Sequence, residues 1–162
     1  MPSFAEPDQS NGSAPFSSAP AACAADGLVP VRLRVRTYEL DSFGHVNNAV
    51  YLNYLEEARS EFLRQIGLSF NDFAVSGVQL VIAEARIRYL SPARYGDDIL
   101  VHGRFSEVRS ASVVIDYRLT DGTGTRVLAT AWTKGAFINP ITGRPRRAPA
   151  AFQEALGRAR TP

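Results

Sequence analysis

One apolar helical stripe constrains the fold of this chain more than any other feature of its sequence. From Val50 onward, apolar residues recur at the 3, 4, 7 spacing of a helix, and Gly67 stands where a left-handed residue would end it. The stripe consists of Tyr51, Tyr54, Leu55, Ala58, Phe62 and Ile66. Asn47 or Asn48 is the expected N-cap. A helix of about five turns is long for a surface element, so its apolar face predicts a partner layer that wraps around it.

The partner layer is predicted to be an antiparallel sheet, because the segments around the helix have the patterns of strands. Before the helix, Val31, Leu33 and Val35 alternate with arginines at period two. After it come four strand-like runs, at residues 78–90, 99–105, 112–119 and 127–138. The sequence Asp-Gly-Thr-Gly at 121–124 predicts a hairpin between the last two. No second long helix separates the runs, so we expect an α+β fold with a sheet curled around one central helix.

Composition supports one globular domain and argues against several classes of function. The 162 residues are 45% hydrophobic and 21% charged, which suits a single domain with its own core. A formal net charge of +2 is too small to indicate nucleic-acid binding. Cys23 is the only cysteine, which excludes an intrachain disulfide. No apolar run approaches the roughly 18 residues of a membrane span, and no cluster of potential ligands has metal-site spacing, so neither a metal nor a cofactor is expected.

The two ends of the chain differ in composition from the middle. Residues 1–29 are rich in proline, alanine and serine and lack lysine and arginine, which predicts a disordered tail. Their acids and the missing basic start fit neither a signal peptide nor a mitochondrial transit peptide, so a cytoplasmic location is expected. We expect the folded domain to span residues 30–149. Residues 150–162 are expected to be a C-terminal tail, in which a short helix can form at 150–160.

The candidate catalytic residues lie where the first strand-like segment approaches the helix. Asp41 precedes a turn at Gly44, and Asn47 and Asn48 open the helix. The first N–H groups of a helix have no internal partner, so they can polarise a carbonyl group while the Asp41 carboxylate attacks it or activates water. Asp41 could equally be a turn residue, and the asparagines could simply cap the helix. The sequence alone is compatible with both roles.

Several other side chains are candidates for substrate binding. His45 could donate to a substrate or orient Asp41, or be only a polar turn residue. Tyr51 and Tyr54 belong to the apolar stripe, and Tyr51, one turn past the helix start, could line a pocket for an acyl group. Glu84 interrupts an apolar strand. Its carboxylate therefore either faces solvent or faces the site with a partner, because an unpaired buried charge would be too costly.

The motif that carries a family resemblance is Tyr38-x-x-Asp41-x-x-Gly44-x-x-Asn47-Asn48-x-x-Tyr51-x-x-Tyr54. It resembles the motif of hotdog-fold thioesterases of the 4-hydroxybenzoyl-CoA thioesterase type. A second segment at 89–97, a strand followed by Pro and Gly-Asp, is also similar to that family. The helix sequence looks like the plant and cyanobacterial branch that acts on acyl groups carried by acyl carrier protein. The resemblance covers about residues 31 to 149, essentially the whole predicted domain.

The resemblance implies an acyl thioesterase with a five-stranded antiparallel sheet around the helix. Asp41 would be the catalytic carboxylate, and the backbone N–H of Asn48 would polarise the thioester carbonyl. Two subunits would form a homodimer, with a tetramer also open, and the sites would lie at the interface. The substrate would be an acyl-CoA or an acyl-acyl carrier protein. A non-catalytic acyl-binding or assembly module on the same fold is the alternative, whereas the context of His45 does not resemble that of a hotdog dehydratase.

One departure from the family concerns the carrier of the acyl group. Some CoA-specific members carry a short basic run after the third strand, and here the matching place holds Arg109 as its one cation. This departure argues against a strong CoA clamp and leaves room for a carrier-protein substrate. The complete predicted substrate-binding set is His45, Asn47, Tyr51, Tyr54, Glu84 and Arg109.

Overall fold

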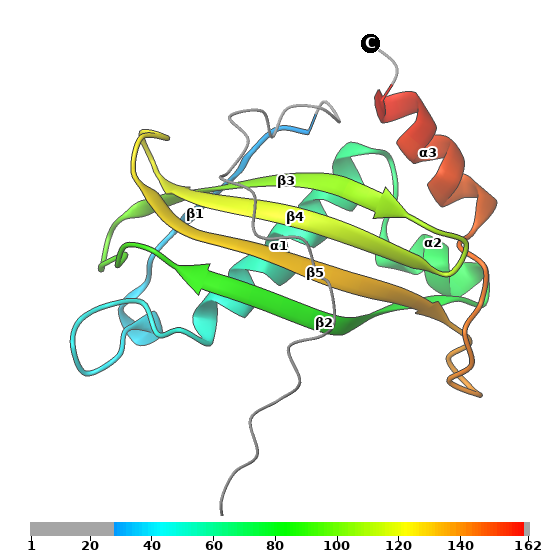
Figure 1. Ribbon diagram of the computed structural model, residues 1–162, viewed down its shortest axis with the longest axis horizontal. Coiled ribbons are helices and arrows are strands. Elements are labelled where there is room, and N and C mark those ends of the chain that lie inside the picture. The colour runs from blue at the N-terminus through cyan, green and yellow to red at the C-terminus, as the bar shows by residue number, and fades with distance from the viewer. Residues whose placement is uncertain (1–27, 161–162) are drawn as a thin grey trace, which may run out of the picture.

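One antiparallel sheet and one long helix make up most of the structure (Figure 1). The computed structural model describes residues 28–160. In chain order the elements are β1 (Val31–Arg34), the 3-10 helix η1 (Thr37–Glu39), α1 (Val50–Gln65), α2 (Phe70–Val75), β2 (Gln79–Tyr89), β3 (Asp98–Val108), β4 (Ser112–Asp121), β5 (Val127–Ile138) and α3 (Ala150–Arg160). The sheet has the order β1-β3-β4-β5-β2, and all neighbouring strands are antiparallel. The predicted α+β fold, a five-stranded antiparallel sheet around one helix, is confirmed.

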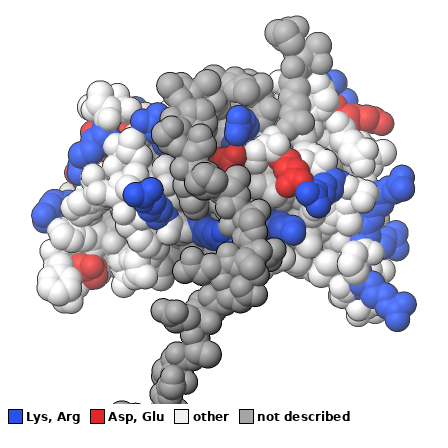
Figure 2. Space-filling model, viewed as in Figure 1, with Lys and Arg blue, Asp and Glu red and all other residues white. Residues whose placement is uncertain are grey.

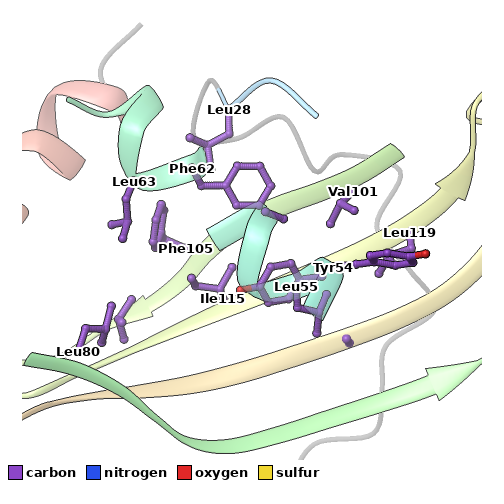
Figure 3. Packing of buried hydrophobic residues seen from close by; sticks show 14 of the residues in the cluster. Leu28, Tyr54, Leu55, Phe62, Leu63, Leu80, Val101, Phe105, Ile115 and Leu119 are labelled. Atoms are coloured by element: carbon purple, nitrogen blue, oxygen red, sulfur yellow. The ribbon is translucent and has the colours of Figure 1, made fainter. Parts of the chain in front are cut away.

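Helix α1 lies against one face of the sheet, and a glycine lets it approach closely. Along β3 and β4 buried residues alternate with half-buried ones, so one face of the sheet points to α1. At Gly103 of β3, a Cβ atom would lie 2.0 Å from Cε2 of Phe62. The Phe62 ring therefore occupies the space that any larger side chain would need. Figure 3 shows Phe62 and Leu55 of α1 in the same layer as Ile115 and Leu119 of β4.

The sequence predicted the C-terminal end of α1 more accurately than its N-terminal end. Gly67 lies just past the helix with a φ of +83°, as its position predicted. At the other end the N-cap is Ala49, so the predicted N-cap at Asn47 or Asn48 is wrong by one or two residues. Asn47 still closes the preceding turn, because its Oδ1 accepts a 2.9 Å hydrogen bond from the backbone N–H of Ala49. The Asn47 side chain thus bonds within this turn and does not cap the helix, and the helix begins only after Ala49.

Helix α3 is part of the hydrophobic core. Phe152 is fully buried, and its ring lies 5.4 Å from that of Phe137 and 5.9 Å from those of Phe73 and Phe105. The segment after residue 149, predicted as a tail, therefore belongs to the packed domain as far as residue 160. Helix α2, which the sequence analysis did not identify, places Phe73 in this cluster. It begins with a capping box, in which Ser69 and Asp72 bond to each other.

The N-terminal end of the described chain is fixed beside the end of α1. Leu28 is buried, and the backbone of Val29 exchanges two hydrogen bonds of 2.8 and 3.0 Å with the side chain of Gln65. The predicted disordered tail falls mostly on residues 1–27, which lie outside the described residues, as does Cys23. None of the helices in the described part of the chain is long and apolar enough to cross a membrane.

We expect Gly103→Ala to destabilise the protein, because the added methyl group must either displace the Phe62 ring or move α1 away from the sheet. Overpacking of this kind typically costs about 1–3 kcal/mol. The free energy of unfolding can be measured by denaturant titration. Gly157→Ala is the matched control, since a Cβ atom at Gly157 of α3 would meet nothing within 4 Å. Equal stability of the Gly103→Ala variant and the wild type would contradict the proposed role of this close approach.

Candidate active site

The Asp41 carboxylate closes a tight turn with only one of its two oxygens. Its Oδ1 accepts hydrogen bonds from the backbone N–H groups of Phe43 (2.8 Å) and His45 (3.1 Å). The backbone N–H of Asp41 donates to the carbonyl of His45 at 2.8 Å, and Gly44 has the positive φ of +73° that the turn requires. Oδ2 accepts no hydrogen bond from the described residues. Asp41 is thus a turn residue and also presents one available carboxylate oxygen.

The backbone N–H of Asn48 is an unpaired donor at the start of α1 among the described residues. The N–H of Asn47 donates to the carbonyl of Glu39 at 2.9 Å, and that of Val50 donates to the carbonyl of Asn47 at 3.0 Å. The N–H of Ala49 is taken by Asn47 Oδ1, whereas that of Asn48 has no acceptor within residues 28–160. An N–H group at the positive end of a helix can polarise a carbonyl oxygen.

Asp41 and Asn48 line the same open pocket, which has a volume of about 340 Å³. The pocket is formed by Asp41, His45, Val46, Asn48, Tyr51, Tyr89, Leu90, Ser91 and Pro92. The structure therefore brings together both predicted catalytic groups and two of the predicted substrate-binding residues, His45 and Tyr51. Apolar walls beside a few polar groups are typical of sites that bind small molecules.

Two tyrosines form the wall next to the helix start. Tyr51 is buried, and its ring meets that of Tyr89 edge to face, with 5.1 Å between the ring centres. The Tyr89 hydroxyl donates to the carbonyl of Asn48 at 2.8 Å and so fixes the peptide next to the free N–H. Burial raises the pKa of both phenols, so both stay neutral donors at physiological pH. The sequence analysis did not identify Tyr89 as a site residue. The available signal was its position at the end of a strand-like run, just before the chain break at Ser91-Pro92.

Asn47 and Tyr54 do not line the pocket, but their hydrogen bonds stabilise the segment between β1 and α1 that carries Asp41. The Tyr54 hydroxyl donates to Oε2 of the buried Glu39 at 2.8 Å, and the same oxygen accepts from the backbone N–H of Arg36 at 2.7 Å. Burial and the Glu39 carboxylate raise the pKa of Tyr54 far above its usual value. This bond ties the segment before Asp41 to the second turn of α1. Tyr54 and Asn47 therefore support the site without lining it.

Glu84 and Arg109 are not brought to the pocket of their own chain. A register shift between Ile82 and Glu84 places Glu84 opposite Lys134, on the face of the sheet away from α1. Glu84 forms an ion pair of 3.0 Å with Arg86, and Arg109 pairs with Glu107. Both residues line a separate depression on that outer face. Figure 2 looks onto this face and shows basic and acidic side chains interspersed around its visible part.

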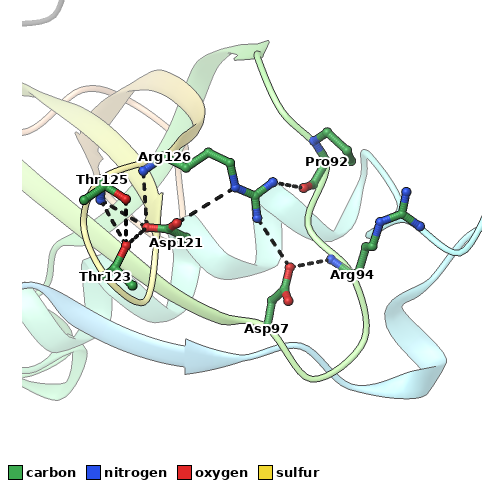
Figure 4. Close-up of polar contacts among 7 residues, drawn as sticks. All are labelled: Pro92, Arg94, Asp97, Asp121, Thr123, Thr125 and Arg126. Atoms are coloured by element: carbon green, nitrogen blue, oxygen red, sulfur yellow. Dashed lines mark hydrogen bonds and ion pairs between the residues drawn. The ribbon is translucent and has the colours of Figure 1, made fainter.

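Arg126, in the hairpin between β4 and β5, holds the loop that forms one wall of the pocket (Figure 4). Its Nη1 donates to the carbonyl of Pro92 at 2.9 Å. Its guanidinium group also lies 3.7 Å from Asp97 Oδ2 and 3.9 Å from Asp121 Oδ2. The same Asp97 oxygen accepts from the backbone N–H of Arg94 at 3.0 Å. One arginine thereby links the hairpin to both ends of the 92–97 loop.

The 92–97 loop in turn supports the turn that carries Asp41. The backbone N–H of Val46 donates to the carbonyl of Ala93 at 2.9 Å, and His45 forms an isolated β-bridge with Arg94. Three segments far apart in sequence thus fix the position of the carboxylate. Among residues 28–160 there is no group of three or more His, Cys, Asp or Glu side chains that could hold a metal ion.

The sequence model of the Thioesterase-like superfamily matches residues 35–156. The chloroplastic acyl-acyl carrier protein thioesterase ATL3 of Arabidopsis thaliana is 47% identical over 87 residues, which are 54% of this chain and 46% of the relative. The long-chain acyl-CoA thioesterase FadM of Escherichia coli is 32% identical over 89 residues, 55% of this chain and 67% of the relative. The chain spans about half the length of the curated Arabidopsis relatives that it matches.

A solved structure has the same arrangement of helix and sheet. The crystal structure of a hypothetical protein from Thermus thermophilus superposes with a TM-score of 0.73 at 30% sequence identity. The match covers 80% of this chain and 98% of the other.

We expect Arg126→Ala to loosen the Asp41 turn while leaving the fold intact. Without the bond to Pro92, the Val46 amide should exchange its hydrogen with solvent about tenfold faster, as expected for loss of about 1.4 kcal/mol of local stability. Hydrogen exchange followed by NMR measures this rate. Arg32→Ala is the control, since Arg32 lies on the short edge strand β1 and pairs with Asp98 and not with the 92–97 loop. Equal exchange of Val46 in both variants would show that Arg126 does not position the turn.

Proposed function

The chain belongs to the Thioesterase-like superfamily, and from that premise we propose that it hydrolyses the thioester of an acyl-CoA or of an acyl-acyl carrier protein. The observation that carries the proposal is the pair of unused groups in one pocket, Asp41 Oδ2 and the Asn48 N–H. A carboxylate and a helix-start donor are the two groups that cleavage of an acyl bond requires. The proposal also fits the printed names of the Arabidopsis and Escherichia coli relatives, which are thioesterases.

The geometry supports a mechanism in which the thioester carbonyl accepts the Asn48 N–H. Asp41 then either attacks the carbonyl carbon itself or takes a proton from an attacking water. Negative charge that develops on the carbonyl oxygen faces the N-terminus of α1, and one such donor typically lowers the barrier by about 3 kcal/mol. In the water route the carbon–sulfur bond breaks, the leaving thiolate takes the proton that Asp41 removed from water, and the acid is released. If Asp41 attacks, the thiolate leaves as an acyl–Asp41 anhydride forms; water hydrolyses this anhydride in a second step, releases the acid and supplies the proton for the thiol.

We propose that the working form is a homodimer paired through β2. This strand is the long edge of the sheet, with 11 residues against 4 in β1. Most of β2 is exposed, including Ile82 (37% exposed) and Tyr89 (47%), which point to the same side of the sheet as α1. An exposed edge of this length invites pairing, and a two-fold axis satisfies the edges of both copies. Because Tyr89 also lines the Asp41 pocket, the pocket would lie at the interface. The cytoplasmic location stays a prediction from the sequence.

We expect Asp41→Asn to abolish most hydrolysis and to keep the fold. The amide oxygen can still accept the bonds from Phe43 and His45, but an amide cannot act as a general base, which typically costs about 10²–10⁴-fold in rate. Thiol release from a panel of acyl-CoA and acyl-carrier thioesters measures the rate. Asp98→Asn, a half-buried acid paired with Arg32, is the control. Near wild-type turnover of Asp41→Asn would refute the assignment, and binding without hydrolysis by the wild type would favour the acyl-binding alternative.

We expect the protein to sediment as a dimer at micromolar concentration and Ile82→Asp to shift it to monomer. The substitution places a charge on an apolar surface that pairing would bury, which is unfavourable without a partner. Val29→Asp is the matched control, because Val29 is 64% exposed just before β1, the opposite edge strand of the sheet. An active wild-type monomer, or equal dimerisation of both variants, would contradict pairing through β2.

A further inference from the structure

The three most exposed aromatic side chains among the described residues lie around the loop that carries Asp41. Phe43 is 80% exposed, Tyr38 76% and Tyr95 66%. Tyr38 belongs to η1, Phe43 to the turn after Asp41, and Tyr95 to the 92–97 loop. None of the three lines the Asp41 pocket, so the proposed hydrolysis does not use them. We call them the aromatic tip, and Figure 1 shows the loops before α1 and before β3 at the same end of the sheet.

Backbone contacts hold two members of the aromatic tip side by side. His45 forms an isolated antiparallel bridge with Arg94. In such a pair the chain before one residue runs beside the chain after the other, so Phe43 and Tyr95 are neighbours. The backbone N–H of Phe43 also donates to Asp41 Oδ1 at 2.8 Å, which makes the tip continuous with the carboxylate turn. Side chains on loops that are fixed in this way lose less entropy when they bind a partner.

The exposed charges beside the aromatic tip are all positive. Of the acidic and basic residues in segments 36–46 and 89–97, only Arg36 and Arg94 are exposed, whereas the three acids are buried or half-buried. Arg36 contacts the tip directly, because its Nη1 donates to the Tyr38 hydroxyl at 2.8 Å. The Arg94 side chain forms no hydrogen bond or ion pair with the described residues, and Figure 4 shows it pointing away from Arg126 and Asp97. The surface therefore combines projecting rings with available cations.

An anionic lipid surface matches this combination better than the surface of another protein does. Aromatic rings enter the headgroup layer of a bilayer while a phenol hydroxyl keeps its contact with water, and arginines bind anionic headgroups. A fluid headgroup layer closes around rings that project from separate loops, whereas a protein interface would need a matching hollow for each ring. None of the three tip residues lies on β2, so pairing through that strand does not account for their exposure.

We propose that the aromatic tip binds the surface of a bilayer that contains anionic lipids, with its three rings in the headgroup layer and Arg36 and Arg94 on the lipid phosphates. The protein then lies on the bilayer and does not cross it. Because Phe43 belongs to the Asp41 turn, the turn comes to lie at the lipid surface. A long-chain acid released there enters the bilayer without crossing water, a consequence that rests on the proposed hydrolysis, whereas the lipid binding itself does not.

Sedimentation of the full-length protein with vesicles tests the rings. The vesicles contain equal parts of phosphatidylcholine and phosphatidylglycerol. We expect the double variant Phe43→Ser, Tyr95→Ser to bind them at least tenfold more weakly than the wild type. The matched control is Val29→Ser, Ile141→Ser, which removes two apolar side chains that are exposed just before β1 and after β5. No binding by the wild type, or equal losses in the two double variants, would overturn the proposal.

Substitution of the two arginines tests the contribution of charge. We expect Arg36→Gln, Arg94→Gln to weaken binding to the anionic vesicles at least tenfold and to leave binding to pure phosphatidylcholine vesicles unchanged. The control is Arg144→Gln, Arg146→Gln, which removes the same charge from exposed positions between β5 and α3. Equal losses in both variants would indicate a general attraction of basic side chains to the anionic surface and would overturn the proposed site.

A fluorescence measurement shows directly which part of the protein meets the lipid. Trp132 is the only tryptophan of the chain and lines the depression on the face of the sheet away from α1. We expect lipids brominated in their acyl chains to quench the emission of Phe43→Trp and to leave that of the wild type unchanged. Quenching of Trp132 in the wild type, or no quenching of Phe43→Trp, would place the contact elsewhere and overturn the proposal.

Two other partners of the aromatic tip are separated by the same double variant, Phe43→Ser, Tyr95→Ser. Conversion of this variant to a monomer would assign the tip to a contact between subunits. Weaker binding of an acyl-acyl carrier protein with unchanged vesicle binding would assign it to an acidic protein partner. Either result would overturn lipid binding. Because the vesicle assays contain no thioester, their failure leaves the proposed hydrolysis standing, and failure of hydrolysis leaves the lipid surface standing.

Discussion

The close packing of α1 on the sheet is the constraint on which the candidate site depends. With Gly103 leaving room for the Phe62 ring, the helix lies directly on β3, and its axis is fixed by a buried stripe. The position of its first turn then follows, and with it the direction of the unpaired Asn48 N–H. A hydrogen-bond donor has value for a reacting carbonyl only if it is held in place before the reaction. The hydrophobic packing far from the pocket therefore supplies the rigidity that the polar chemistry needs.

Asp41 illustrates how a structural and a chemical role can share one side chain. Its Oδ1 is committed to the turn, which leaves Oδ2 of this pocket-lining residue without a hydrogen bond from the described residues. The turn itself is held from behind by the bond between Tyr54 and Glu39 and from the side by the loop that Arg126 clamps. A carboxylate held by backbone donors loses little conformational entropy when a substrate arrives. The two interpretations that the sequence left open, turn residue or catalytic acid, are thus compatible.

The sequence predicted the parts of this protein that depend on local pattern. The helical stripe, the five strands and the closeness of Asp41 to Asn48 are all encoded within short windows, and the structure has them. Tyr89 and Arg126 reach the site only through strand order, which no local window contains. Glu84 shows a different limit, because period-two alternation from Leu80 would turn it toward α1. The register shift after Ile82 inserts one residue and reverses its side, and no residue pattern marks that bulge.

The two edges of the sheet are unequal, because the edge strand β2 is much longer than the edge strand β1. One helix covers the middle of the sheet, so β2 keeps both its backbone edge and the inner side of its middle uncovered. The candidate catalytic groups Asp41 and Asn48 lie at one end of this strand, beside Tyr89. A two-fold axis across the strand exchanges its ends, so that what is distant within a chain becomes adjacent between chains. The same exposed edge that makes a monomer prone to association would thus bring the Tyr89 wall of each pocket to the interface, and would build two equivalent sites at once.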